Sequence, residues 1–408
     1  MAGPGRGWPG RGRENEWRLG PAGGLGVWAA AAATKVEVWP KAPHRDTMTG
    51  DEFVERSVAL QVGAFRGPLD HSEEGLRRTL ERCSGSAVGF RPGGGDAVIF
   101  DASVGVLRAA DHRKVMANAK LRGAFETIRT FRPDFPFVID MQDRRVRTMA
   151  PEGGPVVAVF TFNRIVGDPQ RILWPLSGYH DLGVQQFADA AEPGTVPWPE
   201  KRAQIVWRGI AGGRATVTEP GTGEGMRVKT AVRRYREGRM SEAALRGILM
   251  ASPRYRILDL VQGDPRFDMG FVDGDGYVIA QTPLHAHLGR PRLTRPQMQE
   301  RQFIAVLRGL DVGSSFYWVM NSGSTGFVME TPFETFGSGH FCAWEHFVPF
   351  REDGTDLHAR LDWACSHPDE ARGMAERAAA VAALLVRADL RARVLRGVMD
   401  AVAAMPRA

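Results

Sequence analysis

Short apolar runs alternate with stretches of helical length from about residue 51 onward. Residues 114–130 are predicted to form a helix, because their apolar side chains recur at helical spacing: Val115, Leu121, Phe125 and Ile128. A Pro-bounded run, FPFVIDM, follows and ends at Met141, and VVAVFTF occupies 156–162. Both runs predict buried strands.

The same alternation continues through the second half of the chain. Five further apolar runs predict strands separated by helix-length segments: AQIVW (203–207), YVIAQ (277–281), FIAVL (303–307), GFVM (326–329) and HFVPF (346–350). Such an order is typical of α/β folds with parallel sheets and crossover helices. The Pro- and acid-rich segment 191–202 is the best linker candidate, so we expect two Rossmann-like halves with a cleft between them.

The two ends of the chain differ from this alternating region. Nine of the first 26 residues are Gly, so residues 1–47 are expected to be disordered, and a start of translation at Met48 would explain this extension. Near the other end, Ser366 is expected to cap a helix, and Asp369 in the first turn would close a capping box. This Ala-rich helix is expected to break near Asp389.

The composition is that of an ordinary globular protein. Of 408 residues, 43% are hydrophobic and 25% charged, which excludes a wholly disordered or fibrous chain. The longest apolar candidate, near 377–386, is shorter than the roughly 18 to 20 residues that a membrane-spanning helix needs. Three scattered cysteines, Cys83, Cys342 and Cys365, do not make a disulfide framework or a thiolate zinc site. We therefore expect a soluble or peripherally attached protein in a reducing cytoplasm.

The charge balance is only moderately basic. The chain carries a formal net charge of +6, and residues 1–47 contribute seven basic and four acidic side chains to it. This balance suits a nucleotide or an anionic membrane surface as a partner without requiring either. We find no concentrated basic stripe and no aromatic-basic motif of a known nucleic-acid reader, so nucleic acid is not expected among the partners.

The first candidate for chemistry is the tripeptide WRG, directly after the predicted strand AQIVW. Arg208 and Gly209 stand at the carboxyl end of that strand, and Gly212 and Gly213 follow. Together they offer a guanidinium and free backbone N–H groups to a phosphate. An isolated Arg-Gly turn is more often structural, so this motif needs support from elsewhere in the chain.

That support comes from residues 302–345. A strand is predicted to end at Leu307, and the turn DVGSS then leads into the short helix SFYWVMNS. The N–H groups of Gly313, Ser314 and Ser315 are thus expected at a helix N-terminus, a position that binds anionic diphosphate.

An acid also follows the predicted strand GFVM. Glu334, in the segment ETPFETF, would accept hydrogen bonds from ribose hydroxyls at this edge of the sheet. The plainer interpretation is that the Gly and Ser residues make turns and that Glu334 is solvated.

Six short motifs occur in an order that resembles glycosyltransferase family 90. They are WRG, GxDVxSS followed by a short helix, SGSxxFVM, PxETF, HFVPF and DLxxxLDWAxxxPDEA. This family contains capsule-associated and lipopolysaccharide-type enzymes and the protein O-glucosyltransferases of the eukaryotic secretory pathway. The similarity is plainest over 300–380, fair over 130–210 and undetectable before about residue 80.

The resemblance implies an α/β fold of GT-B type, in which two Rossmann-like domains face a cleft. Residues 48–195 would form the acceptor-side domain, 196–365 the nucleotide-sugar-binding domain, and 366–408 the C-terminal helices. It also implies inversion at the anomeric carbon without a bound metal or other cofactor. The expected partners are a nucleotide-sugar donor, first of all a UDP-sugar, and a lipopolysaccharide or other glycan or glycolipid acceptor. A bacterial, cytoplasmic protein with peripheral contact to an anionic membrane would fit these substrates.

The motifs and the resemblance together assign eight residues to the donor: Arg208, Gly209, Arg214, Asp311, Gly313, Ser314, Ser315 and Glu334. In a site without a metal, a cation or a helix N-terminus must neutralise the departing diphosphate. We expect Arg208 and the turn at 313–315 to do so.

Inverting transfer also needs a general base that takes the proton of the acceptor hydroxyl. Members of the family carry an Asp shortly after the strand that precedes the V-F-T/S-F strand, and IDMQDRR places Asp143 at that position. Asp140 is the near rival, but it lies within the strand and is expected to face the sheet or to bond locally. Alternatively, both acids merely end a strand beside an Arg-rich turn.

Two positions depart from the family pattern. Leu310 stands where Asn is common, and the short helix has Tyr317 in the segment where family members carry a Lys or Arg. Arg308 or Arg214 would replace that cation, or else the donor is altered or the activity weak. A second function therefore stays open, that of an inactive sugar-nucleotide-binding homologue that acts as a scaffold in glycan biosynthesis.

Two metal-like patterns are interpreted as structural. VDGDGY contains Asp273 and Asp275 at the spacing that metal-dependent glycosyltransferases use, but a turn between strands explains it more simply. HAH at 285–287 and the pair His340 and Cys342 assemble no set of four ligands. We therefore expect no metal site.

Overall fold

The computed structural model describes most of the chain after residue 47. The described ranges are 48–63, 65, 67–83, 87–94, 97–143, 154–176, 196–218, 225–274 and 282–408. The predictions for residues 1–47, for the strand YVIAQ and for the first part of the linker, 191–195, lie outside these ranges, as does Asp275.

The first sheet has six strands in the order β3-β2-β1-β4-β5-β7. Their bounds are Val88–Phe90 (β1), Ala97–Asp101 (β2), Val106–Ala109 (β3), Phe137–Ile139 (β4), Ala158–Thr161 (β5) and Arg171–Leu173 (β7). Strands β4, β5 and β7 are parallel, as expected, whereas β1, β2 and β3 pair antiparallel. The apolar runs predicted strands only in the parallel part of this sheet, and the antiparallel hairpin β2–β3, in whose turn Gly105 has a φ of +71°, was not predicted.

The second sheet has five strands in the order β11-β8-β12-β13-β15, and all neighbours are parallel. Its strands are Arg202–Gly209 (β8), Phe267–Phe271 (β11), Arg301–Val306 (β12), Thr325–Met329 (β13) and Phe347–Phe350 (β15). Four of them were predicted from their apolar runs, and β11 was not. The α/β class of the fold is confirmed.

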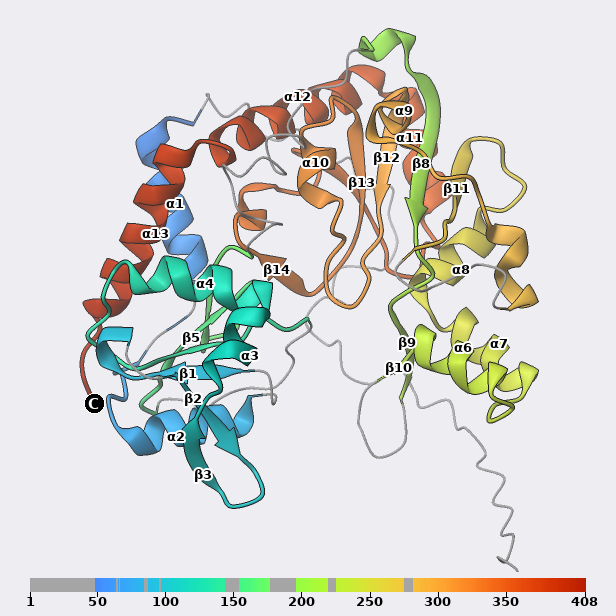
Figure 1. Cartoon of the computed structure of the whole chain (residues 1–408). Coiled ribbons are helices and arrows are strands. Elements are labelled where there is room, and N and C mark those ends of the chain that lie inside the picture. Colours follow the sequence, from blue (N-terminus) through green and yellow to red (C-terminus); the bar gives the residue numbers. More distant parts are fainter. Residues whose placement is uncertain are drawn as a thin grey trace, which may run out of the picture.

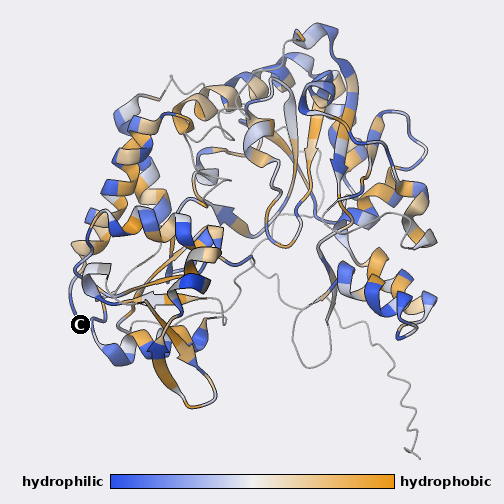
Figure 2. Cartoon of the chain, in the orientation of Figure 1, coloured by the Kyte–Doolittle hydropathy of each residue, from blue (hydrophilic) through white to orange (hydrophobic). Residues whose placement is uncertain are grey.

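Helices cover both sheets, with apolar residues turned toward the strands (Figures 1 and 2). In the first half they are Gly50–Val62 (α1), Glu73–Arg82 (α2), His112–Ala117 (α3) and Ala119–Arg129 (α4). The single helix predicted over 114–130 is in fact two, because the side chain of Asn118 accepts from the N–H groups of Lys120 and Leu121 and so begins α4.

The second half adds a hairpin and shorter helices. The hairpin is Arg214–Thr218 (β9) and Gly225–Arg227 (β10), and the helices are Val228–Arg236 (α6), Glu242–Met250 (α7), Pro253–Leu260 (α8), Arg295–Gln299 (α9) and Phe316–Met320 (α10). In Figure 1 the hairpin and the pair α6–α7 extend below the second sheet.

Three C-terminal helices lead back to the first half: Leu357–Ser366 (α11), Pro368–Leu385 (α12) and Ala388–Ala403 (α13). The predicted break near Asp389 is confirmed. The cap predicted at Ser366 is wrong, because α11 extends through this residue and its hydroxyl donates to the carbonyl of Asp362. Figure 1 shows α12 running from the second sheet to α13, which packs beside α1.

The two halves are also joined by a small antiparallel sheet. Strand β6 (Asn163–Ile165) comes from the first half and pairs with β14 (Phe333–Thr335) from the second, so that Arg164 lies opposite Glu334. The Arg164 side chain is 2% exposed. Its guanidinium donates to Glu334 Oε1 at 2.6 Å and to four backbone carbonyls, those of Leu60, Gln61, Val62 and Arg171.

Three of those carbonyls belong to the last turn of α1, where a helix has no internal partners for them. Arg164 therefore caps α1 and binds β14 at the same time. Gly63, which follows α1, has a φ of +61°, and a Cβ there would lie 2.2 Å from Arg164 Nη2. Only glycine fits beside the guanidinium.

Within the described residues, no helix has the length and apolar character needed to cross a membrane.

Arg164→Ala should destabilise the protein by about 3 to 5 kcal/mol, because it leaves the half-buried carboxylate of Glu334 and several carbonyls without a donor. Urea unfolding followed by tryptophan fluorescence measures this. Arg77→Ala, which removes an exposed ion pair with Glu74, is the control and should hardly move the midpoint. Equal midpoints for the two variants would show that Arg164 does not hold the halves together.

Candidate active site

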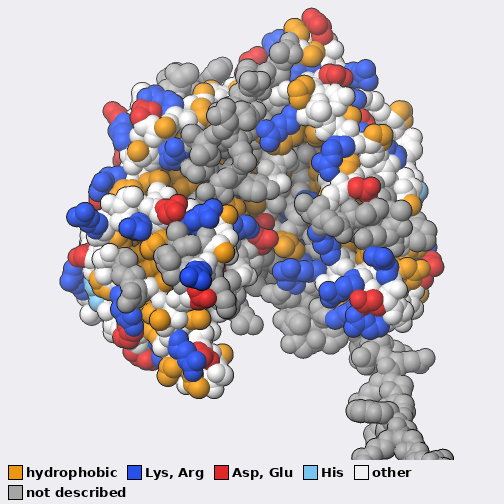
Figure 3. All heavy atoms as spheres, viewed as in Figure 1, with side chains coloured by type: hydrophobic (Ala, Val, Ile, Leu, Met, Phe, Trp, Pro, Cys, Tyr) orange, Lys and Arg blue, Asp and Glu red, His pale blue; other side chains and the backbone are white. Residues whose placement is uncertain are grey.

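A cavity of about 890 Å³ lies between the two sheets. Its lining from the first half consists of Lys120, Asp143, Phe162 and Leu176, and most of the rest comes from the carboxyl ends of β8, β12 and β13 and the loops that follow them. Figure 3 shows the molecule hollowed between the two halves. In open α/β sheets this edge is where ligands bind.

The loop after β12 forms one wall of the cavity. Gly313, Ser314 and Ser315 all line it, and none of their backbone N–H groups donates to an acceptor among the described residues. A Cβ at Gly313 would lie 2.5 Å from Val306 Cγ1, so glycine lets the loop fold back under β12. The structure thus brings the predicted amides to the cavity.

Asp311 shapes this loop. It is 6% exposed, its Oδ1 accepts from the N–H of Val312 at 2.6 Å, and its carbonyl accepts from the Thr331 hydroxyl at 2.9 Å. It lines the cavity, as predicted, and its hydrogen bonds fix the loop that carries the free amides.

Arg208 lies at the cavity, but its guanidinium is turned to the protein. It pairs with Asp268 Oδ1 at 2.6 Å and donates to the carbonyls of Pro291, Trp207 and Asp268. The cause is the register of β8 and β11, in which Arg208 lies opposite Gly270, two residues from Asp268. The predicted contact of this guanidinium with the diphosphate therefore has no support in the geometry, and the neighbouring Gly209 lines the cavity.

Arg214 and the glycines before it lie outside the cavity lining. Arg214 Nη1 donates to the carbonyl of Gly225 within the hairpin, and the N–H of Gly212, expected to be free, donates to the carbonyl of Ile210. Gly213 has a φ of +104°, and a Cβ there would meet the carbonyl oxygen of Gly309 at 3.0 Å. These residues pack one loop against the next.

Arg254 is the cavity cation that the sequence analysis missed. It stands in the first turn of α8 and donates to the carbonyls of Arg308, Ile210 and Leu307 at 3.0 to 3.1 Å. Among the described residues no carboxylate pairs with it, and two of its five N–H donors have no acceptor. Burial, together with nearby Arg308, lowers its pKa to about 10, so it is still a cation at neutral pH.

Arg308, named beforehand as a substitute cation, also lines the cavity and pairs with Glu352. It therefore brings less unbalanced charge than Arg254. The sequence around Arg254, SPRYR, does not indicate that this residue is a cation at the cavity. Only the folded structure shows that its hydrogen-bond partners are carbonyls and not acids.

Asp143 faces these groups from the other half of the molecule. Its side chain is 40% exposed, and its Oδ1 lies 2.9 Å from Lys120 Nζ. Asp140 is 1% exposed and does not line the cavity, in agreement with the expectation that it faces the sheet. Of the two acids, Asp143 is the one that an acceptor in the cavity could reach.

Glu334 does not line the cavity, because Arg164 holds its carboxylate between the two halves. Glu330, the first residue after β13, does line it. Partial burial raises the pKa of Glu330, and nearby Asp356 adds to this. Glu334 was selected because an acid just past a strand end can accept hydrogen bonds from ribose hydroxyls. Glu330 meets this criterion more directly than Glu334 does.

The two departures from the family pattern both lie at the cavity. Leu310 is part of its lining, and Tyr317 is buried in α10. The Tyr317 hydroxyl donates to the carbonyl of Phe336 and lies 2.7 Å from Thr335 Oγ1. A neutral, fully bonded phenol therefore stands in α10, and this short helix supplies no cation to the cavity.

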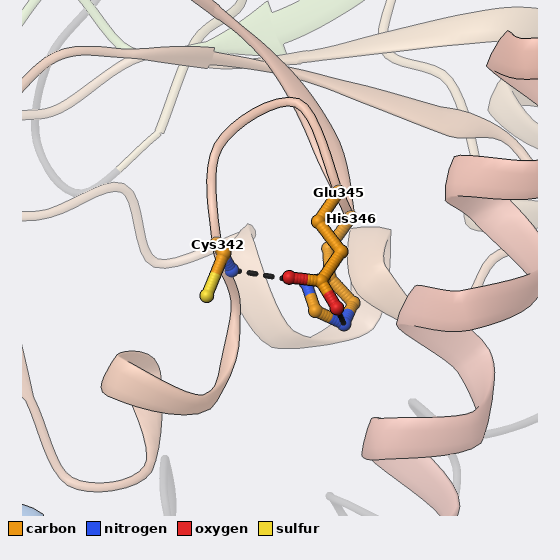
Figure 4. A group of neighbouring side chains, drawn as sticks. All are labelled: Cys342, Glu345 and His346. Atoms are coloured by element: carbon orange, nitrogen blue, oxygen red, sulfur yellow. Dashed lines mark hydrogen bonds and ion pairs between the residues drawn. The ribbon is translucent and has the colours of Figure 1, made fainter. Parts of the chain in front are cut away.

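Cys342, Glu345 and His346 lie close together on the loop before β15, with candidate ligand atoms within 4.8 Å of one another (Figure 4). The N–H of Cys342 donates to His346 Nδ1 at 3.0 Å. In the neutral ring Nε2 then carries the proton, and Arg56 Nη2 lies 4.0 Å from the Cys342 sulfur. A metal would have to displace the proton or the hydrogen bond, so this group is not assigned as a metal site.

The other metal-like patterns are no stronger. Asp273 accepts through its carbonyl from Arg292, and His287 lies 4.0 Å from Asp259. Within the described residues, no set of four ligands surrounds either of them. The expectation that no metal is bound stays a prediction.

A known protein family matches the part of the chain that contains the loop after β12 and so one wall of the cavity. Residues 294–391 match the model of glycosyl transferase family 90, and no curated protein matches the chain. The matched segment contains β12, the loop with the free amides, and α10 to α12, whereas Asp143, Arg208 and Arg254 lie outside it. This match confirms the resemblance to glycosyltransferase family 90 that the order of motifs indicated, and a glycosyltransferase domain occupies this segment.

Proposed function

We propose that this protein is an inverting glycosyltransferase of GT-B type that works without a metal. It would move a sugar from a nucleotide sugar, first of all a UDP-sugar, to a lipopolysaccharide or another surface glycan on the cytoplasmic side. The observation that carries the proposal is the arrangement of charge around one cavity. Free amides and an unpaired guanidinium occupy one wall, and a carboxylate occupies the other.

The donor diphosphate is assigned to Arg254 and the amides of 313–315. A partly buried cation without a counter-ion is costly, and an anionic ligand offsets that cost. The two remaining N–H donors of Arg254 and three loop amides would hold the diphosphate oxygens. Glu330 at the same edge is placed to accept from the ribose hydroxyls, the role first expected of Glu334.

The same groups support metal-independent departure of the nucleoside diphosphate. As the bond between the anomeric carbon and the phosphate oxygen breaks, negative charge grows on the leaving group. Arg254 and Arg308 supply fixed positive charge beside it, and the amides need no reorganisation to stabilise it. A divalent cation would have the same task.

Asp143 is assigned as the general base. The acceptor hydroxyl oxygen attacks the anomeric carbon, its proton passes to the Asp143 carboxylate, and the donor bond breaks on the opposite face, which gives inversion. Lys120 holds the carboxylate at 2.9 Å and is itself placed over the Phe162 ring at 5.2 Å. Lys120 would therefore orient Asp143 toward the cavity.

An inactive, donor-binding scaffold is the second candidate, and the neutral Tyr317 in α10 favours it. A screen separates the two functions. The full-length chain is incubated with UDP-, GDP- and CMP-sugars in the presence of EDTA, and released nucleotide is measured. Turnover in EDTA supports a metal-independent transferase. Donor binding with no release, under all conditions, would identify the scaffold, and turnover that requires added manganese would show that metal independence is wrong.

Arg254→Ala should weaken UDP binding about ten- to a hundredfold, because a charge-assisted contact to a diphosphate contributes roughly 1.5 to 3 kcal/mol. Calorimetry measures this, and Arg254→Lys should retain part of the affinity. Arg208→Ala is the matched control and should mainly lower the melting temperature, since its guanidinium pairs with Asp268. A larger loss of affinity in Arg208→Ala than in Arg254→Ala would show that Arg208, and not Arg254, binds the diphosphate.

Asp143→Asn should lower turnover about 10² to 10⁴-fold while donor affinity and melting temperature stay near those of the wild type. Asp140→Asn should instead lower stability, with a smaller effect on turnover, because that carboxylate is buried. The opposite pattern would transfer the role of base to Asp140. Full activity in both variants would place the base elsewhere or exclude an inverting mechanism.

A further inference from the structure

The hairpin β2–β3 exposes an unusual amount of apolar surface. Ile99, Val104 and Val106 are 36%, 53% and 46% exposed, and they are three of the six large apolar side chains found exposed among the described residues. Strand β3 is the edge of the first sheet. Figure 2 shows this hairpin as a largely apolar projection at the lower edge of the molecule.

Soluble proteins usually protect a sheet edge with charged residues or cover it. Here one ion pair, between Arg108 and Asp101, lies along the hairpin. The turn of the hairpin carries the exposed side chain of Val104. An exposed apolar projection of this kind is typical of a surface that binds another protein or a membrane.

A second feature lies on the helix pair α6–α7. Residues 225–250 contain seven Lys and Arg against two Glu, in a chain whose formal net charge is +6. This concentration of basic residues contradicts the expectation that the chain has no concentrated basic stripe. Val228, Ala231 and Val232 fix the inward face of α6, so that Arg227, Arg233, Arg236 and Arg239 are all exposed.

The two features share one side of the molecule. In Figure 1 the β2–β3 hairpin and the α6–α7 pair both extend along the lower edge, on either side of the space between the two halves. Figure 3 shows Lys and Arg side chains gathered over α6–α7. Met250, at the end of α7, adds a further exposed apolar side chain, at 40%.

We propose that this edge docks on an anionic phospholipid surface. The arginines of α6 would bind lipid phosphates, and the β2–β3 turn would insert its valine side chains among the headgroups. Clustered cations and an apolar projection on the same side of the molecule are the two requirements for reversible attachment to such a surface. A nucleic acid would engage the cations but would leave the apolar turn exposed.

This attachment goes beyond the proposed transfer reaction, because it uses none of the cavity residues. If the acceptor is a glycolipid, docking along this edge would bring the space between the two halves toward the membrane that holds the acceptor. The binding test needs no nucleotide sugar, so its result is independent of whether the chain transfers sugar.

Cosedimentation of the full-length protein with vesicles tests the charge. Wild type should bind vesicles of phosphatidylcholine with about 30% phosphatidylglycerol at low salt, and should not bind pure phosphatidylcholine. The double variant Arg233→Gln/Arg236→Gln should bind about 25-fold more weakly, at about fivefold for each cation. The matched double variant Arg372→Gln/Arg393→Gln, on α12 and α13, should bind like wild type.

The apolar turn is tested by Val104→Asp, which should weaken vesicle binding about tenfold. Val166→Asp is its control, because Val166 is 49% exposed in the turn after β6 and does not belong to the β2–β3 hairpin. Melting temperatures verify that all variants are folded. If the wild-type protein does not bind anionic vesicles, the proposal is wrong. Equal binding by Val104→Asp and wild type, or tighter binding to random DNA than to vesicles, would also contradict it.

Discussion

A buried guanidinium needs a hydrogen-bond acceptor for nearly every one of its donors, and this requirement at Arg164 organises the molecule. The acceptors are the last carbonyls of α1 and a carboxylate of β14, which belong to opposite halves of the chain. Once they surround Arg164, β6 and β14 can pair, and Asp143 is held opposite the loop that follows β12. The distance across the cavity is therefore set by an ion pair that does not line it.

The second constraint is electrostatic. Strands β8, β12 and β13 of the second sheet end at the cavity, where amides and Arg254 lie without counter-charges. Arg208 and Arg308, by contrast, are paired with acids. The arginines at this cavity therefore have two different roles. Those with a carboxylate beside them hold strands and loops together, and the one surrounded by carbonyls keeps its charge for a ligand.

The sequence was informative where an apolar run is strong or a loop is short. Four strands of the second sheet and the position of Gly313 to Ser315 could be predicted in this way. The partner of Arg208 could not, because Asp268 is brought beside it by the register of two strands 60 residues apart. Glu334 was misplaced for the same reason, since its partner Arg164 lies in the other half. The hairpin β2–β3 was missed because its strands are half-exposed and show no clear alternation.

The return of the chain end to the first half has a consequence for the order of folding. The N–H of Leu69 donates to the carbonyl of Pro406, and the N–H of Ala408 donates to the carbonyl of Leu69. Contacts between residues so far apart in sequence form slowly, because a very long loop must close first. During synthesis, therefore, α1 and the first sheet emerge long before α13 can cover them. The buried residues of α1 stay exposed for that interval, and transiently exposed apolar surface of this kind makes a partly folded chain prone to aggregate.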